Sequence, residues 1–129
     1  MAPDDVESRL TTVLGTWAAS SLALGAVLAA RPGARGFARQ TAAWGAVDGV
    51  IAAVGARNRR RRGPTDPARL RKVLLVNAGL DVGYLVAGAA LLRSDRWRGD
   101  GAAVLVQGAF LLALDSAAAA ALPPAPTAG

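Results

Sequence analysis

The 129-residue sequence contains no cysteine and no histidine, and each absence excludes a group of functions. Without cysteine there is no disulfide, no thiol nucleophile and no thiolate metal site. Without histidine the chain lacks the commonest general base and transition-metal ligand, which excludes a Ser-His-Asp triad, a histidine zinc site and histidine-ligated haem. An intramembrane enzyme would have only aspartates, Ser20, Ser21 and Tyr84 to use. We therefore expect no metal, no other cofactor and no enzymatic activity.

Charge is missing from long parts of the chain, although it is plentiful overall. Hydrophobic residues make up 53% of the sequence, while 15 residues are Lys or Arg and the net charge is +6. The basic residues bracket apolar stretches and are not interleaved with aromatic residues, so we expect a lipid bilayer and no nucleic acid as partner. The apolar stretches cover residues 10–30, 37–56, 73–92 and 101–122.

Each apolar stretch is long enough to cross a membrane as a helix, because about 20 residues span the roughly 30 Å of hydrocarbon. A soluble four-helix bundle would need polar outer faces, which the first and fourth stretches do not offer. No segment shows the strand-length alternation of a β-barrel. The sequence therefore predicts an all-α, polytopic membrane protein in which residues 1–129 form a single bundle of four transmembrane helices.

Three polar connections separate the predicted helices. Residues 31–36 have the composition of a turn, and residues 93–100 form a second polar connection on the same side. Residues 57–72 form a basic loop, of which residues 57–67 are expected to be non-helical because of their glycine and prolines. The tail, residues 123–129, is expected to be disordered. The chain starts acidic, unlike a signal peptide, so we expect the first helix to be retained.

The basic residues are divided unevenly between the two predicted sides of the membrane. Arg9 and the eight positive residues of loop 57–72 lie on one side, against six on the other. The positive-inside rule therefore predicts cytoplasmic N- and C-termini in the cell (cytoplasmic) membrane. The densest basic group is interpreted first as a topology determinant and second as a contact for anionic lipid headgroups. It consists of Arg59, Arg60, Arg61 and Arg62.

Three aspartates lie at membrane depth, one in each of the last three predicted helices: Asp48, Asp81 and Asp115. Polar and aromatic residues recur about one or two helical turns from them and share their helix faces. We expect all of these residues to form one intramembrane polar cluster, whose further members are Gln40, Trp44, Asn77, Tyr84 and Gln107. Hydroxyls recur at the same spacing in the first helix, and we expect that stripe to face the cluster: Thr12, Thr16 and Ser20.

No Lys or Arg lies at the depth of these carboxyls, so we expect at least some to be protonated. Intramembrane ionisable residues usually mark the path of protons or cations, which predicts a protein that handles protons or a small cationic or polar substrate, such as a transporter. Alternatively, protonated carboxyls and amides join helices by hydrogen bonds worth about 0.6–2 kcal/mol each, in a structural or accessory membrane subunit. The residues alone leave both interpretations open.

Pairs of glycines spaced four residues apart flank the first two acids. They are Gly45 with Gly49, and Gly79 with Gly83. Such pairs allow helix backbones to approach closely. We expect them to serve packing within one bundle, and assembly of several copies into a homo-oligomer is an open alternative.

Four short motifs resemble those of a known group of proteins. They are Trp44-Gly-Ala-Val-Asp48, Asn77-Ala-Gly-Leu-Asp81-Val-Gly-Tyr84, Arg98-Gly-Asp-Gly101 and Val106-Gln-Gly-Ala-Phe-Leu-Leu-Ala-Leu-Asp115. Over about residues 40–118 the chain resembles a family of small, uncharacterised four-helix bacterial membrane proteins, a domain of unknown function. The resemblance implies a fold and an inner-membrane location, and no activity. Small multidrug-resistance transporters are less similar, because they use a glutamate in the first helix, where this chain has no acid.

Overall fold

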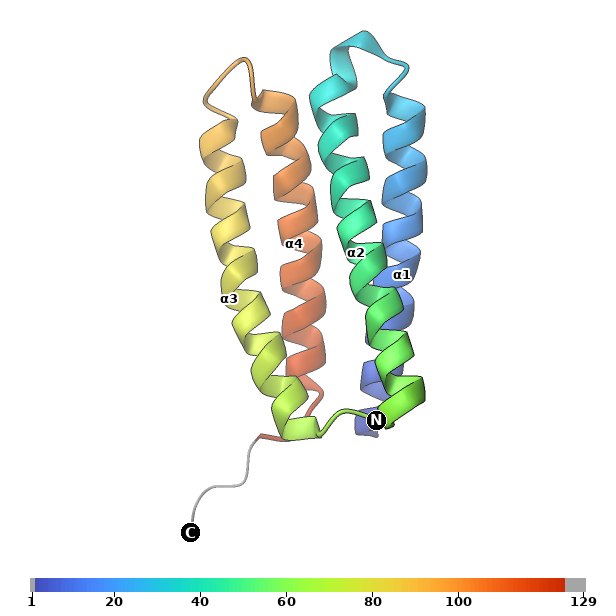
Figure 1. Cartoon of the computed structure of the whole chain (residues 1–129). Coiled ribbons are helices and arrows are strands. Elements are labelled where there is room, and N and C mark those ends of the chain that lie inside the picture. The colour runs from blue at the N-terminus through green and yellow to red at the C-terminus, as the bar shows by residue number, and fades with distance from the viewer. Residues whose placement is uncertain (1, 125–129) are drawn as a thin grey trace.

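The computed structural model describes residues 2–124 as two helical hairpins that lie side by side (Figure 1). Within these residues there is no strand, so the predicted all-α four-helix architecture is confirmed. The predicted disorder of the tail concerns mainly residues 125–129, which lie outside the described residues. The first hairpin contains α1 (Pro3–Leu28), the 3-10 helix η1 (Pro32–Ala34) and α2 (Arg35–Arg62), and the second contains α3 (Pro67–Leu91) and α4 (Arg98–Ala120).

Local sequence signals set the helix ends. Pro3 and Pro67 stand in the first turns of α1 and α3, where the N–H that proline lacks has no helical partner. The carboxyl of Asp66 caps α3 by accepting a hydrogen bond from the Arg69 N–H at 3.1 Å. At the end of α2, Gly63 has a φ of 77°, a left-handed conformation that glycine adopts without strain.

The basic segment 57–62 is helical, so the prediction of a non-helical loop from residue 57 is wrong. Arginine is a good helix former, and four arginines in the last turn of α2 interact favourably with the negative end of the helix dipole. The connection to α3 is therefore only residues 63–66. At the other end, α1 starts at Pro3 instead of about residue 10, because Asp4 and Asp5 are favourable in a first helical turn.

The helices pack mainly within each hairpin, α1 against α2 and α3 against α4. Both hairpins rely on glycine for close approach. A Cβ at Gly45 would come within 2.9 Å of the Ala18 carbonyl oxygen on α1, and one at Gly101 within 2.7 Å of the Gly88 oxygen on α3. The two hairpins meet chiefly through α2 and α4, while α2 and α3 hardly touch.

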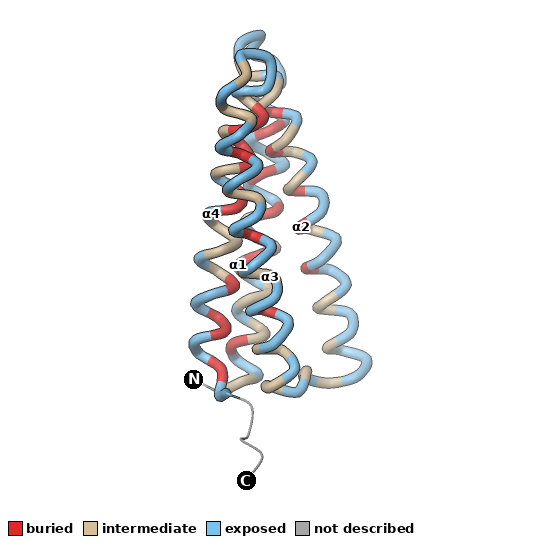
Figure 2. The backbone as a smooth tube through the Cα atoms, turned by 90° about the vertical axis from the view of Figure 1, so that its left-hand side faces the viewer, coloured by how far each residue is buried: buried red, intermediate tan, exposed pale blue. Residues whose placement is uncertain are grey.

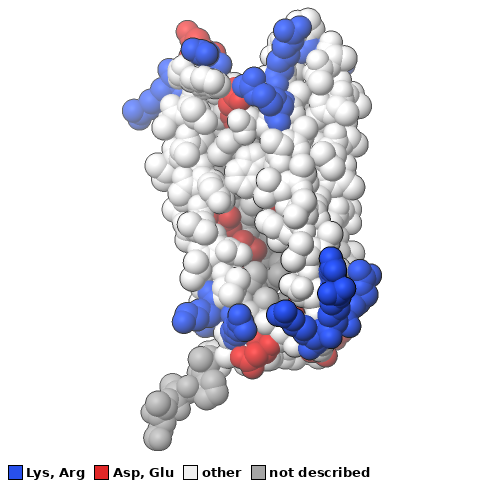
Figure 3. Space-filling model, in the orientation of Figure 1, with Lys and Arg blue, Asp and Glu red and all other residues white. Residues whose placement is uncertain are grey.

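Burial is inverted relative to a water-soluble protein. Asp48, Asp81 and Gln107 are only 2–3% exposed, whereas Val50 and Val86 are more than 60% exposed. Exposed residues cover most of the helix surfaces, and the buried ones lie between the helices (Figure 2). On the face that Figure 3 shows, basic side chains gather at the two ends of the molecule, and the surface between them is uncharged except for acidic atoms in a hollow. This distribution fits a molecule that has lipid around its middle.

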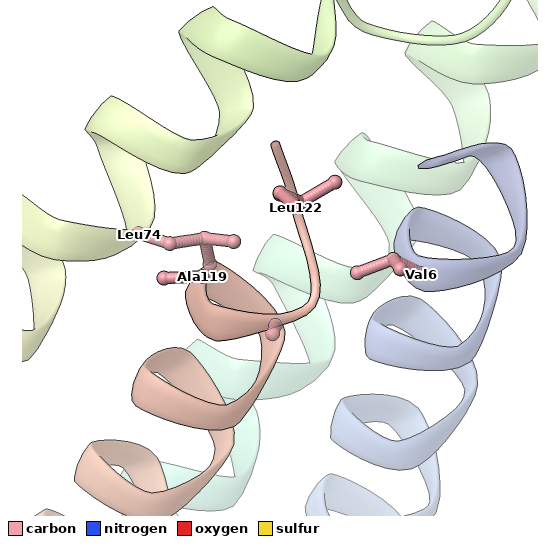
Figure 4. Packing of buried hydrophobic residues seen from close by; sticks show 5 residues of the cluster. Val6, Leu74, Ala119 and Leu122 are labelled. Atoms are coloured by element: carbon pink, nitrogen blue, oxygen red, sulfur yellow. The ribbon is translucent and has the colours of Figure 1, made fainter. Parts of the chain in front are cut away.

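An apolar cluster lies at the end of the bundle that carries the N-terminus and residues 63–66 (Figures 1 and 4). Val6 of α1 and Leu74 of α3 pack there with the end of α4. Besides Ala118 and Ala119, that end contributes Leu122, which is 4% exposed. The cluster packs the start of α1 against α3 and the end of α4.

Within residues 2–124, α1, α3 and α4 are long and apolar enough to cross a membrane. This supports three of the four predicted spans and associates the protein with a membrane. The fourth, α2, is not among the candidates, because arginines at both its ends and Asp48 in its middle interrupt the apolar sequence. Its outward residues are nevertheless apolar, with Val50 63% and Ile51 55% exposed, and it runs beside the other helices along the bundle (Figure 1).

Candidate functional site

A cleft of about 670 Å³ lies between α2 and α3, where the two hairpins diverge. Leu10, Leu14 and Leu111 contribute to its walls from α1 and α4. The cleft extends from residues 63–66 to Trp44 and Tyr84, so it enters the bundle from the end that carries the α2–α3 connection. Its volume is in the range of sites for small molecules.

The three predicted acids, Asp48, Asp81 and Asp115, all line this cleft. They are 2%, 3% and 9% exposed, and acidic atoms are visible in the hollow between the hairpins in Figure 3. Asp81 and Asp115 come from the packed helices α3 and α4, and Asp48 lines the same cleft from α2. The structure therefore brings together three carboxyls from three different helices.

These carboxyls have few partners in the protein. The Oδ2 atoms of Asp48 and Asp81 are buried and have no hydrogen-bond donor. The two ion pairs among residues 2–124, Arg39 with Asp100 and Arg98 with Asp95, do not involve the cleft acids. A buried ionised carboxyl without a partner is costly, so each acid is stable only with a proton, a water or a cationic ligand beside it.

Aromatic and amide side chains complete the deep part of the cleft. Trp44 and Tyr84 face each other from α2 and α3 with ring centroids 4.9 Å apart at 74°. Asn77 lies half-buried on the wall of α3, one turn before Asp81. Six of the eight residues expected in one polar cluster thus line the same cleft: Trp44, Asp48, Asn77, Asp81, Tyr84 and Asp115.

Gln107 lies in a different contact, between α4 and α1. Its Oε1 accepts a hydrogen bond from Trp17 Nε1 at 2.7 Å, and its Nε2 donates to Ser21 Oγ at 3.2 Å. Trp17 also stacks on Phe110 of α4, with ring centroids 3.8 Å apart. Sequence reasoning did not connect Trp17 with Gln107, and no spacing signal links residues so far apart in the chain.

The hydroxyl stripe of α1 faces outward, so the prediction for Thr12, Thr16 and Ser20 is wrong. The face that packs inward carries Ala18, Ser21 and Gly25 instead. Small residues allow α2 to approach that face closely, and Thr16 satisfies its own hydroxyl by donating to the Thr12 carbonyl oxygen at 2.9 Å. A hydroxyl that bonds its own helix can face lipid at little cost.

Gln40 also lies outside the cleft, at the opposite end of the bundle. Its Nε2 donates to Asp100 Oδ1 at 3.2 Å, and Arg39 Nη2 donates to the same oxygen at 2.7 Å. Asp100 is 2% exposed and belongs to the first turn of α4. This polar contact ties α2 to α4, and sequence reasoning missed Asp100 because it lies in a connection that contains several charges.

A family model matches residues 13–116, which include the three cleft acids, Asp100 and Gln107. The chain belongs to DUF6992, a family of unknown function. This confirms the resemblance to an uncharacterised family of small four-helix proteins. No curated protein and no solved structure matches the chain.

The glycines of this DUF6992 member do not all pack as expected. Gly45 contacts α1 closely, and a Cβ at Gly49 would make an ordinary 3.6 Å contact with Ala18. Gly79 and Gly83 are exposed, and a Cβ at either would meet nothing within 4 Å. Packing of α3 uses Gly88 instead, so the sequence motif alone did not identify the glycines of the second hairpin.

The basic group Arg59–Arg62 forms the last turn of α2, at the end where the cleft begins. Arg62 and Arg69 stand at this mouth together with Glu7 and Asp66. Glu7 holds the α2–α3 connection in place, because its carboxylate accepts hydrogen bonds from the N–H of Thr65 at 2.9 Å and from its hydroxyl at 2.7 Å. The mouth therefore carries both signs of charge, whereas the charged side chains deeper in the cleft are acids.

Proposed function

We propose that this protein handles protons or a small cationic or polar substrate in the membrane, through the acids of the cleft. The observation that carries the proposal concerns Asp48 and Asp81, two residues that line the cavity and whose buried Oδ2 atoms have no donor. Buried polar groups are normally satisfied within the protein. A residue that lines a cavity and has a carboxyl oxygen without a donor is suited to bind a ligand or a proton reversibly.

The same molecule supplies a contrast. Gln107 is equally buried, but both ends of its amide are hydrogen-bonded to α1. It has the features of a residue that joins helices. The cleft acids have different surroundings, because Asp48 and Asp81 each have a buried carboxyl oxygen without a donor. This difference favours a ligand-handling role for the cleft over helix packing.

Access to the acids is proposed from one end only. The cleft begins beside residues 63–66, and the opposite end of the bundle is tied by Arg39, Gln40 and Asp100. We place the open end in the cytoplasm, with both termini, in the cytoplasmic membrane of a bacterium, because the more basic side faces inward. In this proposal the protein is not an enzyme and uses no cofactor or nucleic acid, and a homo-oligomer is compatible with it.

The test is flux in liposomes that contain the purified full-length protein and a pH-sensitive dye. We expect Asp48→Asn, Asp81→Asn and Asp115→Asn each to abolish pH-dependent flux, because asparagine has nearly the same shape and cannot exchange a proton. The matched control is Asp95→Asn, which removes an exposed carboxyl whose side chain is 94% accessible in the α3–α4 connection. Unchanged flux in all three cleft variants would refute the proposal.

The alternative is a structural or accessory membrane subunit, and the Gln107–Trp17 contact favours it because it is a satisfied helix-joining bond. Under this alternative the three asparagine variants retain function, while Asp48→Leu or Asp81→Leu destabilises the bundle. Thermal unfolding of both sets in the same detergent separates the two proposals, since the asparagine variants are then as stable as the unmodified protein and equally active.

A further inference from the structure

We propose that the ligand of the cleft is a small organic monocation with an apolar body, held between Trp44 and Asp48. This inference rests on the proposed function and specifies its substrate. The site is more than a group of acids, because Asp48 is only 2% exposed, lines the cavity and leaves its buried Oδ2 without a donor. Asp81 repeats this pattern on the facing helix.

The arrangement of charge favours a single positive charge on the ligand. Asp81 and Asp115 both line the cleft from the packed helices α3 and α4, and two ionised carboxyls that share a poorly solvated site repel each other, so we assign one shared proton to this pair. Asp48 then remains as the acid that has no carboxyl directly paired with it. A monocation beside Asp48 neutralises it without requiring a second charge.

The surroundings of Asp48 favour an organic cation. Trp44 lies one turn before it on the same face of α2, and Tyr84 faces Trp44 from α3. Aromatic faces attract cations, most strongly when water is excluded. The remaining deep walls are aliphatic, with Leu14, Ile51 and Leu80 among the lining residues. An alkylammonium or aromatic ammonium matches both the charge and the apolar walls.

The geometry is less suited to a metal ion. Among the described residues, no group of three or more acidic side chains has the arrangement that could hold a metal. The three carboxyls are distributed over α2, α3 and α4 around a cavity of about 670 Å³. That volume is much larger than a single dehydrated ion needs and is in the range of small organic ligands, about 300–1,000 Å³.

Binding of benzyltrimethylammonium to the full-length protein in lipid nanodiscs tests this inference. The matched probe is neopentylbenzene, which has the same shape with carbon in place of the charged nitrogen. With 5-fluorotryptophan at the three tryptophans, fluorine NMR reports on Trp17, Trp44 and Trp97 separately, after assignment with single Trp→Phe variants. We expect the cation to shift the Trp44 signal with saturation and the neutral probe to have no comparable effect.

Variants identify the groups that bind. We expect Asp48→Asn to weaken cation binding about tenfold or more, since it removes the countercharge in a poorly solvated site. Trp44→Leu should weaken binding roughly two- to tenfold, and Trp44→Phe should recover part of that loss because an aromatic face remains. Asp95→Asn should bind as the unmodified protein does, and circular dichroism confirms the helix content of each variant.

Three outcomes would overturn the inference. The first is equal binding of both probes, which indicates an apolar occupant such as a lipid chain. The second is no binding of benzyltrimethylammonium at any pH between 5 and 9. The third is displacement by sodium ions, which indicates an inorganic cation site. Proton flux that depends on the acids without binding of the organic cation would leave the proposed function standing and refute only the substrate class.

Discussion

The indole N–H of Trp17 donates a hydrogen bond to the amide oxygen of Gln107 at 2.7 Å, and this contact joins the first hairpin to the second. The Gln107 amide also donates to Ser21, so a single side chain of α4 satisfies two polar groups of α1. In a bundle whose hairpins meet mainly through α2 and α4, this bond is a specific additional tie between α1 and α4.

Replacement of Gln107 by leucine should destabilise the protein. Both hydrogen bonds are lost and the Trp17 N–H is left without its acceptor, which should lower the free energy of unfolding by about 1–3 kcal/mol. Thermal unfolding in detergent measures the change. Ser21→Ala removes only the longer 3.2 Å bond and should cost less. Equal stability of Gln107→Leu and the unmodified protein would contradict the assigned contact.

The Arg39–Asp100 pair should matter more than the Arg98–Asp95 pair. The Asp100 side chain is 3% exposed, so Arg39→Met leaves a buried carboxylate with Gln40 as its remaining side-chain donor and should cost about 1–3 kcal/mol. Arg98→Met breaks a pair whose side chains are 64% and 94% exposed and should change stability by less than about 0.5 kcal/mol.

A second substitution tests whether the charge of Asp100 causes this loss. If the uncompensated charge is the cause, adding Asp100→Asn to Arg39→Met should restore part of the stability. Chemical denaturation of the single and double variants provides the comparison. A double variant that is less stable by the full sum of both single effects would argue against a direct interaction.

Two glycines of the same motif type should respond differently to alanine. A Cβ at Gly45 would lie 2.9–3.0 Å from backbone atoms of α1, so Gly45→Ala should force the first hairpin apart and lower its thermal stability. Gly79→Ala meets open space and should be neutral or stabilising by up to about 1 kcal/mol, because alanine is the better helix former. Comparable destabilisation by both would indicate that Gly79 packs against a second copy.

Glu7 should protect the α2–α3 connection. Because its carboxylate accepts a hydrogen bond from the Thr65 N–H, Glu7→Ala should accelerate hydrogen exchange of that amide by about tenfold or more. Mass spectrometry of peptides that cover residues 63–66 measures the change. Asp5→Ala removes an exposed acid two residues away and is the matched control.

The lack of cysteine makes the proposed orientation directly testable. Single cysteines introduced by Thr65→Cys and Ser94→Cys lie in the two connections at opposite ends of the bundle. An impermeant maleimide added to intact cells should label the Ser94→Cys protein, and the Thr65→Cys protein only after permeabilisation. The reverse pattern would invert the proposed topology.

The helical bundle could be predicted from the sequence, because a long uncharged stretch can satisfy its backbone hydrogen bonds in lipid by forming a helix. The sequence also predicted that Asp48, Asp81 and Asp115 share a cluster, since a carboxyl that faces lipid instead of the bundle interior is costly. Spacing does not fix the rotation of one helix relative to its neighbours, however. Gln107 is only two turns from Asp115 along α4, yet it faces α1 and takes no part in the cleft.

The wrong predictions concern residues that cost little free energy whether they are buried or exposed. The Thr16 hydroxyl bonds the backbone of α1 and so can face outward, and glycines occur both where helices meet and where they do not. Gln40 was assigned to the right helix face, but its position near the start of α2 puts it beside Asp100 at the far end of the bundle. Depth in the membrane, as well as helix face, determines which polar residues meet.

The division into two hairpins has a consequence for how the chain is made. Each hairpin is packed within itself, and α1 is apolar enough to enter the membrane whereas α2 is marked by charges. Once Arg62 has been synthesised, both α1 and the α2 face that contains Gly45 are present. We therefore expect the two helices to enter the membrane as a packed pair, in which the apolar α1 offsets the cost of inserting the more polar α2. In the second hairpin, α3 and α4 are both apolar enough to cross a membrane, so neither requires a more apolar partner for insertion. In the proposed topology, the order of the helices along the chain is therefore expected to help Asp48 reach the middle of the bilayer.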